Sequence, residues 1–259
     1  MATAPQATNL PLLYQDLVPL NSNEHAKWKS RMLENAKFMD GQHAIPLTIE
    51  EFVPASRNYP IIFSASETPV PLVLMGMNEG VNTFMNEEGQ FDRPVYVPAY
   101  IRRYPFMLAK LRPDTDELSL CFDPTSGAVG EFKEGNDLFN GTDPSDNTKA
   151  ILKFCEDFEN AGAQTHAFVE ELKKLDLLMD GEVSIQQEGQ EKPYVYRGFK
   201  MVDENKLREL RGDAVRKLNQ NGILALIHAH LFSLQLMREI FAVQVAQGKV
   251  PQISELPAN

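Results

Sequence analysis

Short apolar runs bounded by proline, glycine and polar residues dominate the first half of the chain. The runs at 59–63 and 71–75 have the length of strands, so the pattern predicts two buried strands there. A third strand is expected at 118–122. Residues 81–85 alternate between apolar and polar side chains and precede a glycine-containing loop, which predicts a hairpin. The segment 22–39 fits either a helix or a strand.

Helical spacing of apolar residues begins near residue 145. Ser145 or Asn147 is placed to cap a helix that Gly162 is expected to end. A second helix should follow and stop at Gly181, where the pattern predicts a β-hairpin with its turn near 188–190.

The C-terminal part predicts three more helices. Asp203 is expected to cap a short helix over 204–210, and Gly212 begins another. The last helix should run from about residue 222 to 247, because its apolar residues recur at steps of three and four. The stripe comprises Ile223, Ile227, His230, Leu234, Met237 and Phe241.

These elements predict an α+β fold, in which a strand-rich N-terminal half packs on a mostly helical C-terminal half with one inserted β-hairpin. We expect a single domain over residues 13–247, with a strand-rich lobe at 13–144 and a helical lobe at 145–247. Residues 1–12 and 248–259 are expected to be flexible.

Composition narrows the classes of function. The chain has 259 residues, 43% of them hydrophobic, and a net charge of −11. An acidic surface repels phosphate backbones, so we expect no nucleic-acid partner. The two cysteines, Cys121 and Cys155, each lie in an apolar run, which favours buried free thiols over a disulfide.

The sequence predicts neither a secretory signal nor a membrane span. Residues 1–9 are small and polar, without the charged and apolar regions of a signal peptide. The apolar run at 222–232 is interrupted by two histidines and has about half of the roughly 20 residues that a membrane helix needs. We therefore expect a cytoplasmic location, with a non-classical route if the protein associates with a surface.

The stretch 94–106 combines four aromatic residues, three prolines and two adjacent arginines. Arg102 and Arg103 are candidate ligand-binding residues, because two guanidinium groups can hold a carboxylate or phosphate by paired hydrogen bonds. The alternative is a structural role, in which one arginine pairs with an acidic residue and stacks on an aromatic ring to tie the lobes together.

Tyr96, Tyr100 and Tyr104 are candidate contacts for a peptide or protein partner, although the same rings would also suit a seam between lobes. His230 completes the candidate set, with a hydrogen-bonded core histidine as the alternative. It lies on the apolar stripe, whereas His228 faces the opposite side of the helix. Metal-ligand and phosphate-loop spacings are missing from the sequence, so we expect no metal and no cofactor.

Four segments resemble the bacterial SapC family, and the resemblance extends over roughly residues 13–246. The segments are long and of unusual composition, and they lie at 59–63, 97–106, 198–207 and 229–234. The family that the chain resembles takes its name from an association with bacterial surface layers. Its members are also labelled peptide-transport permeases, which conflicts with the lack of a predicted span.

The resemblance carries over no catalytic residues. It implies a gene context of outer-membrane receptors, cupin-like oxygenases and flavin-dependent halogenases. We therefore expect an accessory or interaction protein with a protein or peptide partner, related to the surface layer or acting beside enzymes that modify peptides or small molecules. The alternative is an enzyme or ligand-binding protein that uses Arg102, Arg103 and His230 around a cleft to hold an anionic or peptide ligand.

Overall fold

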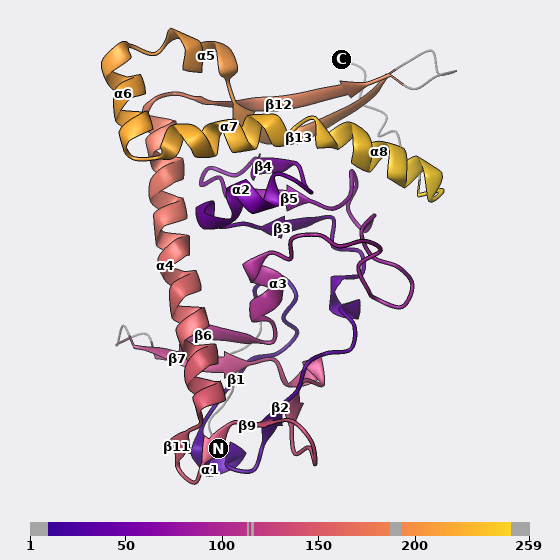
Figure 1. The fold of residues 1–259 in the computed structure, drawn as a ribbon, viewed down its shortest axis with the longest axis vertical. Coiled ribbons are helices and arrows are strands. Elements are labelled where there is room, and N and C mark those ends of the chain that lie inside the picture. The colour runs from indigo at the N-terminus through magenta and orange to yellow at the C-terminus, as the bar shows by residue number, and fades with distance from the viewer. Residues whose placement is uncertain (1–9, 113, 115–116, 187–192, 250–259) are drawn as a thin grey trace. The chain divides into compact units, whose positions relative to one another are not determined.

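The computed structural model has the predicted α+β fold (Figure 1). It describes residues 10–112, 114, 117–186 and 193–249. The chain forms two compact units, each assembled from two separate stretches of sequence. Unit 1 comprises residues 1–38 and 100–160, and unit 2 comprises residues 39–99 and 161–259. Of the ends expected to be flexible, residues 1–9 and 250–259 lie outside the described part.

Unit 1 contains small antiparallel sheets. One has the order β1-β7-β6, formed by β1 (Val18–Pro19), β7 (Leu118–Phe122) and β6 (Phe106–Lys110). A second has the order β8-β2-β9, formed by β8 (Val129–Gly130), β2 (Lys29–Ser30) and β9 (Asn136–Asp137). A two-stranded ladder joins β10 (Phe139–Asn140) and β11 (Asp143–Pro144). The strand predicted at 118–122 is confirmed.

Short helical turns lie between these strands or where the chain passes from one unit to the other. They are α1 (Ser22–His25), the 3₁₀ turns η1 (Lys37–Met39) and η3 (Pro124–Ser126), and α3 (Ala99–Arg103). The segment 22–39 therefore holds both a helical turn and a strand. The core of unit 1 lies between the sheets and α4, and its buried members are Phe106, Leu108, Phe122, Val129, Leu138 and Cys155.

A single long helix, α4 (Asp146–Lys174), replaces the two helices expected on either side of Gly162. Gly162 lies inside the helix, and a side chain built there would meet nothing within 4 Å. A glycine in a helix interior costs about 1 kcal/mol relative to alanine, which the burial of Cys155, Phe168 and Leu172 outweighs. The prediction that Gly162 ends the helix was wrong because glycine weakens a helix without blocking it.

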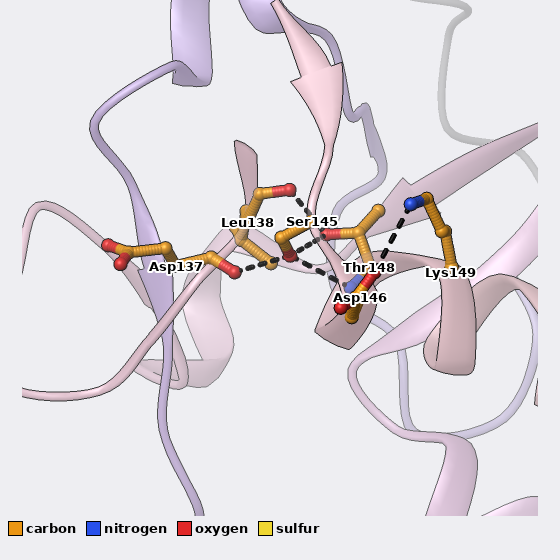
Figure 2. Close-up of polar contacts among 6 residues, drawn as sticks. All are labelled: Asp137, Leu138, Ser145, Asp146, Thr148 and Lys149. Carbon is orange, nitrogen blue, oxygen red and sulfur yellow. Dashed lines mark hydrogen bonds and ion pairs between the residues drawn. The ribbon is translucent and has the colours of Figure 1, made fainter. Parts of the chain in front are cut away.

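Ser145, one of the two predicted caps, closes the N-terminus of α4 (Figure 2). Its Oγ accepts a hydrogen bond from the Thr148 amide at 3.1 Å and donates one to the Asp137 carbonyl oxygen at 2.6 Å. The Thr148 hydroxyl donates to the Leu138 carbonyl oxygen at 2.6 Å. The start of the helix is thereby bonded to the end of β9 and the residue after it.

Unit 2 is built on a five-stranded antiparallel sheet with the order β12-β13-β4-β5-β3 (Figure 1). Its strands are β12 (Leu178–Ile185), β13 (Tyr194–Val202), β4 (Ile61–Ser64), β5 (Pro71–Leu74) and β3 (Ala44–Pro46). The runs at 59–63 and 71–75 thus form neighbouring buried strands, as predicted. The predicted hairpin is β12–β13, and its turn near 188–190 lies outside the described residues.

The hairpin predicted from residues 81–85 and the loop after them forms as a short one. A single bridge joins Met85 and Phe91. Backbone hydrogen bonds flank it, from the Asn86 amide to the Gln90 carbonyl oxygen at 2.9 Å and from the Asp92 amide to the Phe84 carbonyl oxygen at 3.0 Å. The ladder does not extend further back, because the Asn82 amide oxygen accepts from the Phe84 amide and the Thr83 hydroxyl donates to the Met75 carbonyl oxygen.

The remaining helices lie on this sheet or beside it. They are η2 (Ile49–Glu51), α2 (Phe52–Ala55), α5 (Glu204–Glu209), α6 (Gly212–Gln220), α7 (Ile223–Ser233) and α8 (Leu236–Ala246). Asp203 caps α5 as predicted, because its carboxylate accepts from the amides of Asn205 and Lys206. The predicted single helix over 222–247 is wrong in one respect, since it is divided into α7 and α8 at Leu234 and Gln235.

The break between α7 and α8 is a tightened turn. Leu234 and Gln235 keep helical backbone angles, but the Met237 amide bonds back three residues to the Leu234 carbonyl oxygen. Within the described residues, 223–246 is the one helical stretch long and apolar enough to cross a membrane by length and composition. A third of its most apolar window is buried against the rest of the protein, and core helices of soluble proteins meet the same criterion.

We predict that Ser145→Ala lowers the free energy of unfolding by about 1–2 kcal/mol, because it removes the helix cap and leaves the Thr148 amide without its acceptor. Urea denaturation at constant pH measures this change. Ser184→Ala, at an exposed position on β12, is the matched control and should change stability by less than about 0.5 kcal/mol. Equal curves for the two variants would show that the cap contributes nothing.

Candidate functional site

Arg103 lies inside unit 1, at the end of the short helix α3. Its residue is 6% exposed, and its guanidinium group faces the rings of Phe158 at 4.1 Å and Tyr100 at 4.6 Å. Nη1 lies 3.3 Å from a carboxylate oxygen of Glu159. Arg103 is thus enclosed by aromatic rings and paired with an acidic residue, which matches the structural alternative for one of the two arginines.

One nitrogen of this guanidinium group has no protein partner. Among the described residues, Arg103 Nε is the one buried side-chain nitrogen or oxygen without a hydrogen bond. An unsatisfied buried donor costs free energy, so the packing of the rings and the pair with Glu159 must offset that cost. The neighbouring Arg102 is exposed and lies over the Phe154 ring at 5.3 Å.

Tyr100 and Tyr104 are also buried in unit 1. The Tyr100 hydroxyl donates to the Leu12 carbonyl oxygen at 2.8 Å. Tyr104 stacks on Phe38 at 4.3 Å, and its hydroxyl reaches the carboxylate of Asp123 at 3.4 Å. Burial, together with that carboxylate, raises the pKa of Tyr104 to about 12. Both rings therefore contribute to the interior of unit 1 and not to its surface.

Tyr96 lies in unit 2, apart from the other aromatic candidates in the division of the chain. Its hydroxyl donates to Glu51 Oε1 at 2.9 Å, and its amide donates to the Asn58 side chain at 3.0 Å. Its carbonyl oxygen accepts from the Tyr59 hydroxyl at 2.9 Å. These bonds hold the irregular, proline-rich segment that contains Tyr96.

His230 also lies in unit 2, where α7 packs against the sheet. It is fully buried, and both of its ring nitrogens bond to backbone groups of neighbouring strands. Nδ1 lies 2.8 Å from the Ile61 carbonyl oxygen on β4, and Nε2 accepts from the Val202 amide on β13 at 3.1 Å. The amide can only donate, so the ring is neutral with its proton on Nδ1.

Ser233 completes this contact one turn later on α7. Its hydroxyl accepts from the Ile61 amide at 2.8 Å and donates to the His230 carbonyl oxygen at 2.6 Å. Both backbone groups of Ile61 are therefore satisfied by side chains of α7. Burial lowers the pKa of His230 to about 4, against the weaker opposing effect of its bond to Ile61.

The segments that make these contacts belong to a sequence that matches a known protein family. A family model described as SapC matches residues 20–240, which is most of the chain. The chain belongs to the SapC family. No curated protein and no solved structure matches it. Three of the four segments that resemble SapC proteins, 59–63, 198–207 and 229–234, meet at His230, and the fourth, 97–106, carries Arg103.

The remaining candidate chemistry of this SapC chain is limited. Both cysteines are buried free thiols, as predicted, and burial raises the pKa of each to about 11. Such thiols are poor nucleophiles at neutral pH. In the part of the chain that the structure describes, no three His, Cys, Asp or Glu side chains are grouped to hold a metal ion.

The sequence reasoning missed the solvent side of α7. Phe232 is 67% exposed and stacks on His228, with ring centroids 5.6 Å apart. Their spacing of four residues on a helix was the available signal. The candidate residue chosen from the sequence, His230, lies on the buried side of the same helix.

We predict that Arg103→Ala lowers the free energy of unfolding by about 2 kcal/mol or more, because it removes a buried group that packs on two rings and leaves Glu159 without its partner. Arg208→Ala is the control, since its ion pair with Glu204 is exposed and should contribute less than about 0.5 kcal/mol. If the two variants melt together, Arg103 does not stabilise unit 1.

We predict that His230 makes stability fall as the pH decreases from about 6.5 towards 4. Its folded pKa lies below the unfolded value, so the unfolded chain binds more protons in this range and gains stability relative to the folded one. The loss from this residue should be about 2 kcal/mol between pH 7 and pH 5.

The measurement is the difference in unfolding free energy between pH 7 and pH 5 for the parent, His230→Gln and His228→Gln. The pH dependence should shrink in His230→Gln, and His228→Gln is the matched control at an exposed position on the same helix. Should His230→Gln fail to fold, NMR titration of the parent ring provides the test. Protonation of His230 near pH 6.5 would contradict the assignment.

Proposed function

We propose that this SapC-family protein is a non-catalytic accessory protein that binds a partner protein through the outer face of α7. The observation that carries the proposal is the exposure of Phe232 on a helix side that has no charged residue from 225 to 235, before Glu239. Ala225, His228, Phe232 and Gln235 are all exposed. On a helix these positions fall within one face about 80° wide, opposite the side that carries His230.

The lack of charge extends along the whole of α7. Residues 222–237 contain no Asp, Glu, Lys or Arg, although charged residues make up 24% of the chain. A helix that faces water on one side normally carries charged residues there. Half-buried leucines, Leu224 and Leu231, border the exposed face and widen its apolar surface. Exposed apolar surface of this kind is typical of binding sites.

A protein partner suits this face better than a lipid surface. Helices that lie on membranes carry Lys and Arg along their polar side, and the outer face of α7 has none. The net charge of −11 also repels anionic lipids. Aromatic residues are enriched, and charged residues depleted, in the buried core of protein interfaces.

The alternative of an enzyme or ligand-binding protein built on Arg102, Arg103 and His230 has less support. Both ring nitrogens of His230 bond to backbone groups, so neither is available to a ligand without breaking the sheet contact. Arg103 is paired with Glu159 and enclosed by rings. The surface-layer connection of the partner remains a prediction from the family resemblance.

We predict that Phe232→Glu weakens partner binding without unfolding the protein. A substitution at this exposed position should change stability by less than about 0.5 kcal/mol, whereas loss of a central aromatic contact weakens binding by about 2 kcal/mol, or roughly thirtyfold. A photo-crosslinking amino acid at Gln235 in cells should capture a defined protein in the parent and not in Phe232→Glu. The same probe at Val195, an exposed position on β13, is the control.

The proposal would be overturned if the captured protein were a second copy of this chain. It would also be overturned if the probe at Val195 captured the same protein, or if Phe232→Glu left the capture unchanged. Flotation with phospholipid vesicles is run in parallel with purified protein. Flotation that Phe232→Glu abolishes would replace the protein partner with a lipid surface.

A further inference from the structure

A half-open pocket in unit 1 lies where the loop after β2 faces the turn η3. Its volume is about 270 Å³, and it is lined by residues 31–35 together with Ser126 and Gly127. This volume lies just below the usual range for ligand pockets, so it suits a group of a few atoms. None of its lining residues belongs to α7 or to α3, the helix that carries Arg103.

Arg31 is held in this pocket by three contacts. Its amide donates to the Ala128 carbonyl oxygen at 2.9 Å, and its Nε donates to the Gly127 carbonyl oxygen at 3.0 Å. Its guanidinium group lies over the Phe132 ring at 4.2 Å. Arg31 is exposed, and a guanidinium group held at Nε and over a ring has lost part of its rotamer freedom before any ligand binds.

The supports of Arg31 are themselves fixed by backbone geometry. Gly127 has a φ of 68°, a left-handed conformation that glycine adopts without strain. Gly130 lies against the Phe132 ring so closely that a Cβ atom there would be 3.2 Å from the ring edge. Gly130 is also paired with Lys29 in the β2–β8 ladder, two residues before Arg31. The arginine and its ring are therefore held by the same ladder.

The terminal nitrogens of Arg31 are the donors of its guanidinium group that remain beyond Nε. Within the described residues, no carboxylate forms an ion pair with Arg31, although acidic residues exceed basic ones by 36 to 25. Two parallel N–H groups match the two oxygens of a carboxylate. Glu34 also lines the pocket and opposes a second negative charge, so a monoanion fits better than a phosphate dianion.

We propose that Arg31 binds the carboxylate of a small ligand or of a peptide C-terminus, with an apolar group of the ligand against Leu33 and Met32. Leu33 is half-buried in the pocket lining, and Met32 is 92% exposed beside it. An exposed methionine next to a fixed arginine offers adaptable apolar contact to a ligand whose charge is already positioned. The site does not depend on the proposed function of α7.

The test is NMR titration of the intact protein at pH 7, following the Arg31 Nε–H and Gly127 amide signals. The probes are N-acetyl-leucine, its neutral amide and inorganic phosphate. N-acetyl-leucine should shift both signals saturably, and its amide should not. Arg31→Lys keeps the charge but loses the stacked, forked geometry, so it should weaken binding about tenfold, the loss expected for one charged hydrogen bond.

Arg211→Lys is the matched control, because its side chain is 88% exposed and lies in unit 2. It should bind N-acetyl-leucine as the parent does. The proposal is overturned if the shifts do not saturate, if the neutral amide shifts the signals equally, or if phosphate binds as tightly as the carboxylate. Parent-like binding by Arg31→Lys would also overturn it, and circular dichroism verifies that this variant is folded.

Discussion

The backbone amide and carbonyl oxygen of Ile61 hydrogen-bond to side chains of α7 and not to the neighbouring strand β13. The organisation of unit 2 depends on these two bonds. Strand β13 pairs with β4 only at Phe63 and Ser64 and has diverged by Ile61. Side chains of α7 supply the missing partners. Ser233 accepts from the Ile61 amide, and His230 donates to the Ile61 carbonyl oxygen. The other ring nitrogen of His230 accepts from the Val202 amide. A buried, unpaired backbone group costs about as much as a lost hydrogen bond, so the bonds specify where α7 lies.

This attachment determines which side of α7 faces solvent. His230, Ser233 and Ile227 point into the sheet contact, which leaves Phe232 and His228 on the opposite side. Fixing the helix by polar bonds means that its apolar outer face is not required for attachment. The proposed docking surface is thus a consequence of the same contact that three of the family-like segments build.

Local patterns predicted local elements well. The buried strands β4 and β5 followed from short apolar runs, and the caps at Ser145 and Asp203 followed from residue type and position. The prediction at Gly162 was wrong because glycine permits a helix to continue. The hairpin predicted after 81–85 is present but short, because Asn82 and Thr83 bond through side chains.

The candidate sites depended on contacts that a pattern cannot reveal. The unusual composition around Arg103 was visible, but its burial against Phe158, some fifty residues away, was not. Arg31 escaped notice because Gly127 and Phe132, which position it, lie about a hundred residues away. Sequence spacing within one helix did place His230 on the buried side, although it left open whether the ring served the fold or a ligand.

The most direct test of the attachment of α7 is amide hydrogen exchange at Ile61 and Val202 in the parent and in Ser233→Ala. In the parent, both amides should exchange as slowly as those in the paired strands, because side chains of α7 accept from them. Ser233→Ala should speed exchange at Ile61 by about tenfold or more while Val202 stays protected by His230. Rapid exchange at both amides in the parent would contradict the account.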